Sequence, residues 1–347
     1  MPGLGSSRVG SRHCVGDVLS LSQSTHVMSR IRQVFGVRDI RTQNQSTFAC
    51  IALAQILLRD RQRRCRTGGG VGLDLPNDDL VGAPRSATLD CPFHADKARV
   101  QSGERKVMLL TGASRGIGHA TAKLFSEAGW RVISCARRPF DGERCPWEAG
   151  DEDHVQVDLG NHRMLPRAIT EVKMRLAGAP LHALVNNAGV SPKTPDGDRL
   201  TSLTTSTETW MRVFHLNLVA PILLAKGLFD ELRAASGSIV NVTSIAGSRV
   251  HPFAGSAYAT SKAALASLTR EMAHDYAPHG IRVNAIAPGE IGTDMLSPDT
   301  EACVVPSIPL RRVGTPDEVA KVIFFLCSDA ASYVTGAEVP INGGQHL

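Results

Sequence analysis

Residues 111–118 read Thr-Gly-Ala-Ser-Arg-Gly-Ile-Gly, and they follow directly on the apolar run at residues 107–111. From residue 117 to residue 128 the apolar positions recur at helical spacing, and Gly129 stands where such a helix would end. Glycines at a strand-to-helix turn allow a tight turn and a close approach of the backbone to a phosphate. The N-terminus of the following helix adds unpaired N–H groups and a positive dipole end. The segment therefore predicts a dinucleotide site at the start of an α/β fold.

Short apolar runs alternate with helical patterns through the rest of the chain. Strands are expected at residues 107–111, 131–136, 154–159, 183–186, 238–242, 282–287 and 338–341. Helices are expected at residues 117–128, 163–176, 257–276 and 316–327, with two more in 208–235 that meet near Pro221. Thr315 and Glu318 have the spacing of a capping box. This alternation predicts a doubly wound parallel sheet, a Rossmann fold, of about seven strands with helices on both faces.

The first 105 residues differ in composition from the rest. They hold fourteen arginines and one lysine against nine acidic residues, and no glutamate precedes Glu104. We predict a poorly structured basic leader over residues 1–105 and one folded domain over residues 106–347. Three origins of the leader stay open: a targeting segment, a disordered interaction tail, or translation begun too far upstream. The third is favoured because the composition is odd for selected coding sequence.

Composition excludes several classes of protein. The net charge of +5 is concentrated in the leader, so nucleic acid is not an expected partner. The eight cysteines form no CxxC pair and no zinc-ligand spacing, so no metal is expected and a reducing compartment is indicated. Apolar runs fall short of the roughly 18 residues that a membrane span needs. A cytoplasmic protein without membrane contact is therefore expected.

The end of the second expected strand bears on the choice of dinucleotide. An acidic residue there would bind the ribose hydroxyl of NAD. Residues 134–138 instead read Ser-Cys-Ala-Arg-Arg. Guanidinium groups suit a 2′-phosphate by charge and by fork geometry. The sequence therefore favours NADP(H) over NAD(H), with Arg115 and Arg137 as the binding residues and Arg138 as solvated surface.

Tyr258 and Lys262 stand at positions i and i+4 of the expected helix 257–276, one above the other on one face. A phenol with an ordinary pKa near 10 is a poor acid or base at neutral pH. A nearby ammonium is expected to lower that pKa and to make proton transfer by Tyr258 effective. Alone, this pair is more often two surface neighbours than a site.

The motifs that accompany this pair follow in a fixed order. They are Thr111-Gly112-x-x-x-Gly116-x-Gly118, Asp158, Asn186-Asn187-Ala188-Gly189, Asn217, Ser244, Tyr258-x-x-x-Lys262 and Pro288-Gly289. Together they resemble the short-chain dehydrogenase/reductase family in its common single-domain form, of the 3-oxoacyl-reductase kind. The resemblance covers residues 106–347, so this part would be the catalytic domain.

The resemblance implies a role for each of four residues. Tyr258 would be the catalytic acid or base, and Ser244 would hydrogen-bond the oxygen of the substrate. Lys262 would act on the tyrosine and hold the nicotinamide ribose. Asn217 would hold a water in a proton relay.

The resemblance also implies a cofactor site. Asp158 would lie at the adenine edge, Asn186 would fix the central sheet, and Thr293 would contact the carboxamide. The full expected set is Gly112, Ser114, Arg115, Gly116, Ile117, Gly118, Arg137, Asp158, Leu159, Asn187, Ala188, Gly189, Tyr258, Lys262, Pro288, Gly289, Ile291 and Thr293.

Purely structural roles compete for some of these residues. Ser244 could cap its strand, with Thr243 as a rival for the substrate contact; Asn217 could be a locally satisfied buried polar group; and Asp158 could cap the next helix. Ser244 and Tyr258 are fourteen residues apart, one more than is usual in the family, and the loop at residues 248–256 can absorb the difference.

The activity expected from these residues is reversible hydride transfer between NADP(H) and a ketone or secondary alcohol. A loop over residues 290–309, with Met295, Leu296, Val304, Val305 and Ile308, would cover a small-molecule substrate that the sequence does not identify. The alternative is a non-catalytic NADP(H)-binding regulator of the same fold. The resemblance implies a homotetramer or homodimer that packs through the helix of Tyr258 and its neighbour.

Overall fold

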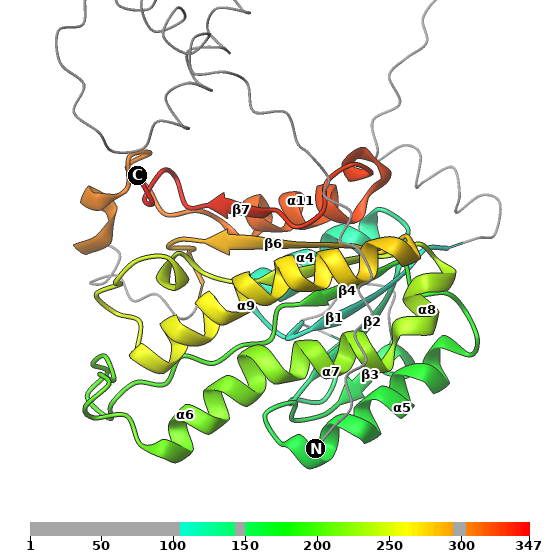
Figure 1. Ribbon diagram of the computed structural model, residues 1–347, viewed down its shortest axis with the longest axis horizontal. Helices are drawn as coiled ribbons and strands as arrows, with labels where there is room; N and C mark the ends of the chain where they lie inside the picture. The colour runs from blue at the N-terminus through cyan, green and yellow to red at the C-terminus, as the bar shows by residue number, and fades with distance from the viewer. Residues whose placement is uncertain (1–104, 143–149, 294–302) are drawn as a thin grey trace, which may run out of the picture. The chain divides into compact units, whose positions relative to one another are not determined.

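Seven strands form one parallel sheet in the computed structural model, which describes residues 105–142, 150–293 and 303–347 (Figure 1). The strands are β1 (Val107–Thr111), β2 (Arg131–Ala136), β3 (His154–Gln156), β4 (Ala183–Asn186), β5 (Ser238–Val242), β6 (Arg282–Pro288) and β7 (Glu338–Ile341). Their order across the sheet is β3-β2-β1-β4-β5-β6-β7. The predicted doubly wound parallel sheet is confirmed.

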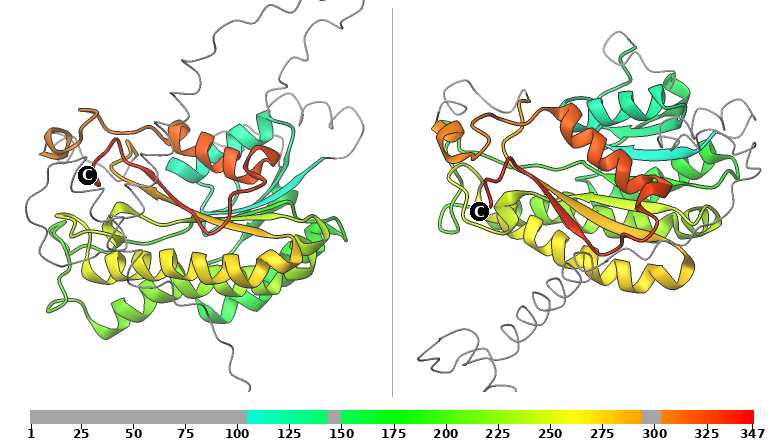
Figure 2. Two further views of the ribbon diagram at one scale, coloured as in Figure 1. Left: turned by 45° about the horizontal axis from the view of Figure 1, so that its top comes forward. Right: turned by 90° about the horizontal axis from the view of Figure 1, so that it is seen from above.

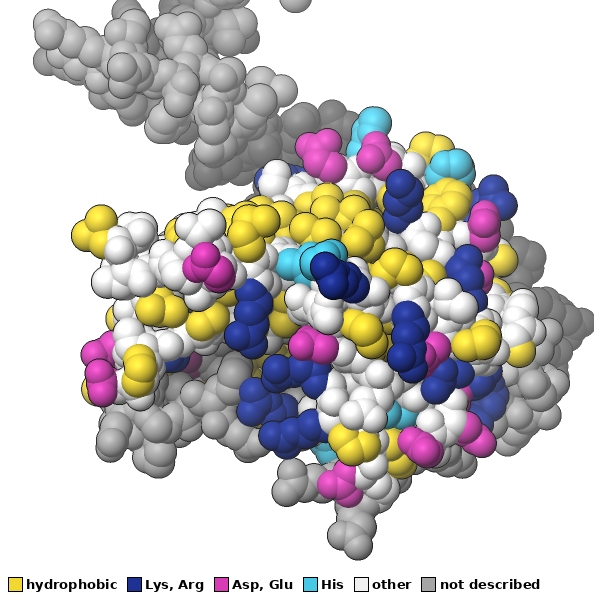
Figure 3. All heavy atoms as spheres, turned by 90° about the horizontal axis from the view of Figure 1, so that it is seen from below, with side chains coloured by type: hydrophobic (Ala, Val, Ile, Leu, Met, Phe, Trp, Pro, Cys, Tyr) yellow, Lys and Arg dark blue, Asp and Glu magenta, His cyan; other side chains and the backbone are white. Residues whose placement is uncertain are grey.

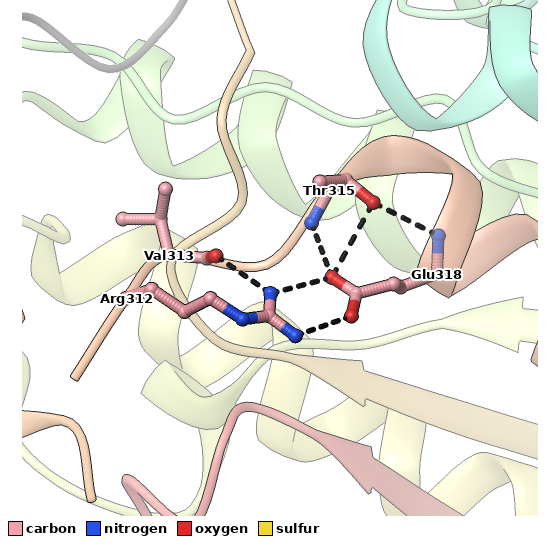
Figure 4. A network of polar contacts seen from close by, with 4 residues as sticks. All are labelled: Arg312, Val313, Thr315 and Glu318. Atoms are coloured by element: carbon pink, nitrogen blue, oxygen red, sulfur yellow. Dashed lines mark hydrogen bonds and ion pairs between the residues drawn. The ribbon is translucent and has the colours of Figure 1, made fainter. Parts of the chain in front are cut away.

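Helices cover both faces of the sheet (Figure 2). On one face, α4 (Gly116–Glu127) and α11 (Pro316–Cys327) pack against each other. On the other face lie α5 (Leu165–Leu176), α6 (Thr207–Phe214), α7 (Ala220–Gly227), α8 (Phe229–Ala234) and α9 (Ser256–Tyr276). The predicted capping box begins α11: the Thr315 hydroxyl accepts a hydrogen bond from Glu318 N, and the Glu318 carboxylate accepts one from Thr315 N (Figure 4).

The first strand shows how the core is divided between the two faces. Val107 and Leu109 pack with residues of α5, α7 and α9, whereas Met108 and Leu110 pack with residues of α4 and α11. None of the four side chains is more than 3% exposed. A strand buried on both faces must be apolar at every position, which explains why these strands appear in the sequence as continuous apolar runs.

The chain changes direction between β1 and β4, which are neighbours in the sheet. From β1 it continues through α4 to β2, and from β4 it continues through α6, α7 and α8 to β5 on the other face. The two connections lie on opposite faces of the sheet, and ligands of such sheets bind beyond the carboxyl ends of the strands at such a point.

Some predicted element boundaries were wrong. The third strand was expected at residues 154–159, but β3 ends at Gln156, and the chain turns where the Asp158 carboxylate accepts a hydrogen bond from Gly160 N. The helix expected from residue 163 is α5, and it begins at Leu165 after a 3₁₀ turn, His162–Met164. Residues 208–235 form three helices and a π-helical turn, His215–Val219, instead of two helices. Pro221 follows this turn and has no N–H for the carbonyl of Asn217, so a regular α-helix cannot continue through it.

Charged side chains of both signs are interspersed with apolar ones on the face shown in Figure 3. Surface pairs on α5, such as Arg167 with Glu171 at 2.6 Å, contribute at most about 1 kcal/mol each. Within the described ranges, no helix has the length and the apolar character that crossing a membrane requires. The predicted leader up to Glu104, together with Met295 and Leu296 of the predicted lid, lies outside the described residues.

Candidate active site

The glycine segment forms a tight turn between β1 and α4. Gly112 and Gly116 have φ values of +75° and +55°, a region of backbone space that favours glycine. A Cβ atom on Gly118 would lie 2.1 Å from the carbonyl oxygen of Gly112, so only glycine fits where the helix meets the turn. The N-cap residue Arg115 makes no side-chain capping bond, and the first turn of α4 has no acidic residue. The positive end of the α4 dipole is therefore not offset by a carboxylate of the first turn and can interact with an anionic group.

Side chains from β1 and from the loop after β4 hold the turn in place. Asn187 Nδ2 donates to the carbonyl oxygens of Thr111 and Gly112, both at 3.0 Å. The Thr111 hydroxyl accepts hydrogen bonds from the backbone N–H groups of Asn187 and Ala188, also at 3.0 Å. These hydrogen bonds thus join the motif at residues 186–189 to the glycine turn, between β1 and β4, where the chain changes direction in the sheet.

Asn186 forms a buried chain of amide contacts below this point. Its Nδ2 donates to Asn241 Oδ1 at 2.9 Å, and Asn241 Nδ2 donates to the Thr269 hydroxyl at 3.0 Å. The chain links β4, β5 and α9, which places the helix that carries Tyr258 firmly on the sheet. The sequence had not indicated Asn241 or Thr269, because polar residues at these spacings have no distinctive pattern.

Three arginines lie near the candidate cofactor site, Arg115 in the glycine turn and the other two after the end of β2. Arg115, Arg137 and Arg138 are exposed, and their guanidinium groups make no hydrogen bond or ion pair with another described residue. Asp158 is exposed as well, and it closes the turn to Gly160 instead of capping a helix. Leu159 is buried beside it. The arrangement offers cationic groups beyond the end of β2 and a carboxylate beyond β3.

Tyr258 and Lys262 lie on successive turns of α9, with Lys262 Nζ 5.6 Å from the centre of the tyrosine ring. Lys262 is buried and donates a hydrogen bond of 2.6 Å to the carbonyl oxygen of Val242 at the end of β5. The Ser244 hydroxyl lies close enough to the Tyr258 phenol to lower its pKa, and the Ser244 oxygen accepts a hydrogen bond from Ala246 N at 3.2 Å. The three groups expected to react are therefore adjacent.

The pKa of Tyr258 does not follow the expectation. Burial raises the pKa of this phenol, the hydrogen bond with Ser244 lowers it, and the negative charge of Glu290 raises it further. Burial also lowers the pKa of Lys262, to about 8. Without the cofactor, desolvation therefore outweighs the attraction between phenolate and ammonium that the sequence argument relied on.

Asn217 lies in the π-helical turn, one of the rare helical forms that occur often at functional sites. Its Oδ1 accepts a hydrogen bond from Val190 N at 2.9 Å, and its Nδ2 donates to Val190 O and to the Ser261 hydroxyl. The side chain therefore joins the loop after β4 to α9. A Cβ atom on Gly189 would lie 3.4 Å from both Asn217 Oδ1 and Lys262 Nζ, so Gly189 lies between these two polar groups.

Thr243 is turned away from Tyr258. Its hydroxyl lies 2.7 Å from the carbonyl oxygen of Ile286 and 2.6 Å from the Glu338 carboxylate, on β6 and β7, and it has one hydrogen to donate to either of them. Ser244 is therefore the hydroxyl of this pair that meets the tyrosine.

The segment after β6 returns to the glycine turn. A Cβ atom on Gly116 would lie 3.0 Å from Thr293 Cγ2, which places Thr293 beside the turn. Pro288 ends β6, Gly289 N donates to the carbonyl oxygen of Ile341 at 3.0 Å, and Ile291 is buried and pairs with Gly314. Of the predicted residues of this segment, Thr293 thus lies beside the first motif, whereas Gly289 and Ile291 contact β7 and the segment before α11.

The sequence did not indicate His251 or its pairing with Glu290, the first residue of the predicted substrate loop. His251 and Glu290 approach each other to 2.7 Å, although they are 39 positions apart in the chain. Only the fold brings the loops after β5 and β6 together, so no sequence signal could have paired them. Of the predicted lid residues, Val304 and Ile308 are packed into the protein, at 4% and 2% exposure.

Comparisons with known proteins agree with this geometry. The family model described as Enoyl-(Acyl carrier protein) reductase matches residues 112–346. Protein FixR of Bradyrhizobium diazoefficiens is 88% identical over 278 residues, which are 80% of this chain and 100% of that protein. The 3-oxoacyl-[acyl-carrier-protein] reductase FabG of Aquifex aeolicus is 36% identical over 252 residues, 69% of this chain and 96% of that protein.

A solved structure is similar over the same region. It is an oxidoreductase of the short-chain dehydrogenase/reductase family from Brucella ovis in complex with a partially ordered NAD. The two chains are 57% identical with a TM-score of 0.60, and the match covers 69% of this chain and 100% of that one. The fold and the matches show that the chain belongs to the short-chain dehydrogenase/reductase family of oxidoreductases.

Proposed function

We propose that this protein transfers a hydride reversibly between NADP(H) and a ketone or secondary alcohol, with Tyr258 as the acid or base. The observation that carries the proposal is the group of Tyr258, Ser244 and buried Lys262 at the carboxyl ends of the strands. The glycine turn, with its free helix start, fits a dinucleotide phosphate beside this group.

Each residue has a physical task in the proposed reaction. The nicotinamide supplies or accepts the hydride when it is bound. During reduction, the Tyr258 hydroxyl gives its proton to the oxygen of the substrate, and Ser244 stabilises the charge on that oxygen through a hydrogen bond. During oxidation, Tyr258 takes the proton back.

Lys262 and Asn217 complete the proposed route for the proton. The buried ammonium of Lys262 opposes the negative charge that develops on Tyr258 when the phenol loses its proton. The backbone carbonyl oxygen of Asn217 has no α-helical donor because Pro221 has no N–H. This oxygen can therefore accept a hydrogen bond from a water. Gly189 leaves the space between these two residues open.

The preference for NADP(H) rests on the arginines near the candidate cofactor site. We expect Arg137→Asp to shift the ratio of kcat/KM values toward NADH by roughly 10- to 100-fold, because a charge-assisted bond to a phosphate is replaced by repulsion. Steady-state kinetics with both cofactors measure this shift. Arg212→Asp, a change at an exposed arginine on α6, is the matched control. An unchanged ratio in Arg137→Asp would show that the charge of Arg137 does not determine the cofactor preference.

The activity itself is tested by a panel of ketones and secondary alcohols, followed by the absorbance of NADPH. We expect turnover of at least one compound and none in Tyr258→Phe. Binding of NADPH without turnover of any compound would instead favour the non-catalytic regulator. We also place the enzyme in the cytoplasm, because its cysteines are scattered and unpaired in sequence.

A further inference from the structure

Glu290 carries a negative charge that acts on Tyr258. It follows β6 after Gly289, so it lies at the same edge of the sheet as the proposed reaction. Its backbone is fixed: the carbonyl oxygen accepts a hydrogen bond from Gly314 N at 2.9 Å, and the next residue, Ile291, pairs with Gly314. Its side chain is only 13% exposed. A carboxylate held this firmly in a partly buried position needs a partner.

His251 is the nearest charged or titratable group, with Nε2 at 2.7 Å from Glu290 Oε1. Nδ1 of His251 accepts a hydrogen bond from Phe253 N at 3.3 Å, so in the neutral ring the hydrogen is on Nε2. This ion pair fixes the position of the carboxylate, although its geometry is not that of a hydrogen bond. A carboxylate has about four acceptor positions, so capacity remains for a further donor.

The loop that carries His251 is tied down from the other side. Lys193, in the loop after β4, donates from Nζ to the carbonyl oxygen of Phe253 and lies 5.8 Å from the centre of its ring. Arg199 Nε donates to the carbonyl oxygen of Ala254 at 2.7 Å. These cations are therefore engaged with backbone oxygens. Burial lowers the pKa of Lys193, and the negative charge of Glu290 opposes that shift. Burial raises the pKa of Tyr258, and the charge of Glu290 adds to that shift.

We propose that Glu290 is a specificity residue that accepts a hydrogen bond from a hydroxyl on the carbon next to the reacting one. The substrate class is then a vicinal diol and the α-hydroxy ketone formed from it. This inference rests on the proposed function, because it names the substrate of the same site.

Other substrate chemistries fit the site less well. An apolar acyl chain would cover the carboxylate without offering a donor, which is costly for a charged group. A carboxylate on the substrate would be repelled by Glu290. An ammonium would meet the positive charge of Lys193, which lies close enough to interact with Glu290. A neutral hydroxyl supplies a further donor to the carboxylate without either conflict.

Matched pairs of alcohols test the inference directly. The pairs are cyclohexane-1,2-diol with cyclohexanol, butane-2,3-diol with butan-2-ol, and a hexopyranose with its 2-deoxy analogue, each oxidised with NADP⁺ and with NAD⁺. For the wild-type enzyme we expect kcat/KM to favour the diol member by roughly 10- to 100-fold, the effect of one hydrogen bond to a charged group. The readout is this ratio rather than either rate alone.

Variants at position 290 assign the preference to the carboxylate. We expect Glu290→Leu to abolish it and Glu290→Gln, which keeps a neutral acceptor, to leave an intermediate ratio. Glu271→Gln is the matched control at an exposed glutamate of α9, and it should keep the wild-type ratio. Thermal unfolding and NADPH binding show whether each variant is folded. The wild-type ratio remains decisive if the leucine variant does not fold.

The outcomes separate this inference from the proposed function. Turnover of the single alcohols at the rate of the diols, or a preserved ratio in a folded Glu290→Leu, overturns the inference and leaves the oxidoreductase intact. A 2-amino alcohol that reacts better than the diol overturns the choice of a hydroxyl. No turnover of any alcohol or ketone in a protein that binds NADPH overturns the proposed function and the inference together.

Discussion

Lys262 is a single ammonium group buried under Tyr258. Within the described part of the chain its ammonium donates one hydrogen bond, to the carbonyl oxygen of Val242, and burial lowers its pKa to about 8. Burying a cation opposite a neutral carbonyl destabilises the folded state, because the lost hydration is only partly replaced. We therefore assign Lys262 a role in the chemistry of Tyr258 and in binding a cofactor, and no role in stabilising the fold.

Replacement of this lysine separates stability from function. We expect Lys262→Met to raise the free energy of unfolding at pH 7 by about 1 kcal/mol or more and to abolish turnover. Urea unfolding and steady-state kinetics measure the two effects. Lys226→Met, at an exposed lysine of α7, should change neither. A Lys262→Met protein that is less stable than the wild type would show that the ammonium holds the fold together.

The same lysine gives a pH dependence with a definite sign. Its folded-state pKa of about 8 lies below the ordinary value of 10.5. Below pH 8 the group is charged in both states, and between about pH 8 and 10.5 the folded protein loses the proton first. The unfolded state then binds more protons, so the Lys262 contribution to the free energy of unfolding rises with pH in this window. The rise should be absent in Lys262→Met.

At the scale of elements, the start of α11 is joined to the candidate site. The Arg312 guanidinium and Thr315 both bind the Glu318 carboxylate and hold its pKa at about 2, and Gly314 beside them pairs with Ile291 and Glu290 (Figure 4). The capping box therefore fixes the entry of the helix and, through Gly314, the backbone of the segment after β6.

Loss of this cap should destabilise the helix. We expect Thr315→Ala to lower the free energy of unfolding by about 1 kcal/mol, because the N–H of Glu318 loses its acceptor. Thermal or urea unfolding measures the change. Thr170→Ala is the control, since the Thr170 hydroxyl bonds only to a carbonyl within α5. Equal stability of the two variants would mean that the cap contributes nothing to this helix.

Elements buried on both faces were the most predictable from sequence. β1, β2, β4 and β5 have the expected bounds because each is a short, mainly apolar run between turn residues. β7 also has the expected bounds, although it is an edge strand whose side chains are exposed or half-buried. β3 was overestimated because its apolar alternation continues past Gln156 into a turn made by Asp158. The π-helical turn at Asn217 could not be foreseen, since it results from a missing donor at Pro221 rather than from periodicity.

The candidate site was predictable where it depends on local motifs. The glycine turn and the pair Tyr258 and Lys262 are local, and the structure places them as the spacing suggested. The direction in which the pKa of Tyr258 shifts depends on burial. The approach of His251 to Glu290 depends on a contact between loops that are distant in the sequence. These properties exist only in the folded chain.

At the scale of the whole molecule, every candidate site residue lies after residue 110. We propose that residues 106–347 form the catalytic domain and that the preceding residues do not take part in catalysis. A chain that begins at Val100 should keep kcat/KM within about twofold of the full chain, because β1 and all site residues are retained. A large loss of activity would assign a catalytic or folding role to the leader.

Light scattering on the same two proteins tests the oligomeric state. We propose a homodimer or homotetramer, as the family resemblance implies, and exposed apolar side chains such as Phe325 and Tyr333 offer surface for association. We expect the full chain and the shortened chain to have the same number of subunits, two or four. Their measured masses should therefore be in the ratio of their chain lengths. A monomer at micromolar concentration would contradict this proposal.

The most direct test of the central claim compares cofactor binding with turnover in Tyr258→Phe. On a substrate found with the alcohol panel, we predict that kcat falls by at least about 10³-fold, while the Kd for NADPH, measured by calorimetry, changes by less than about threefold. Tyr276→Phe on the same helix is the control and should keep full activity. A Tyr258→Phe enzyme that binds NADPH and retains wild-type turnover would contradict the assignment of Tyr258 as the acid or base.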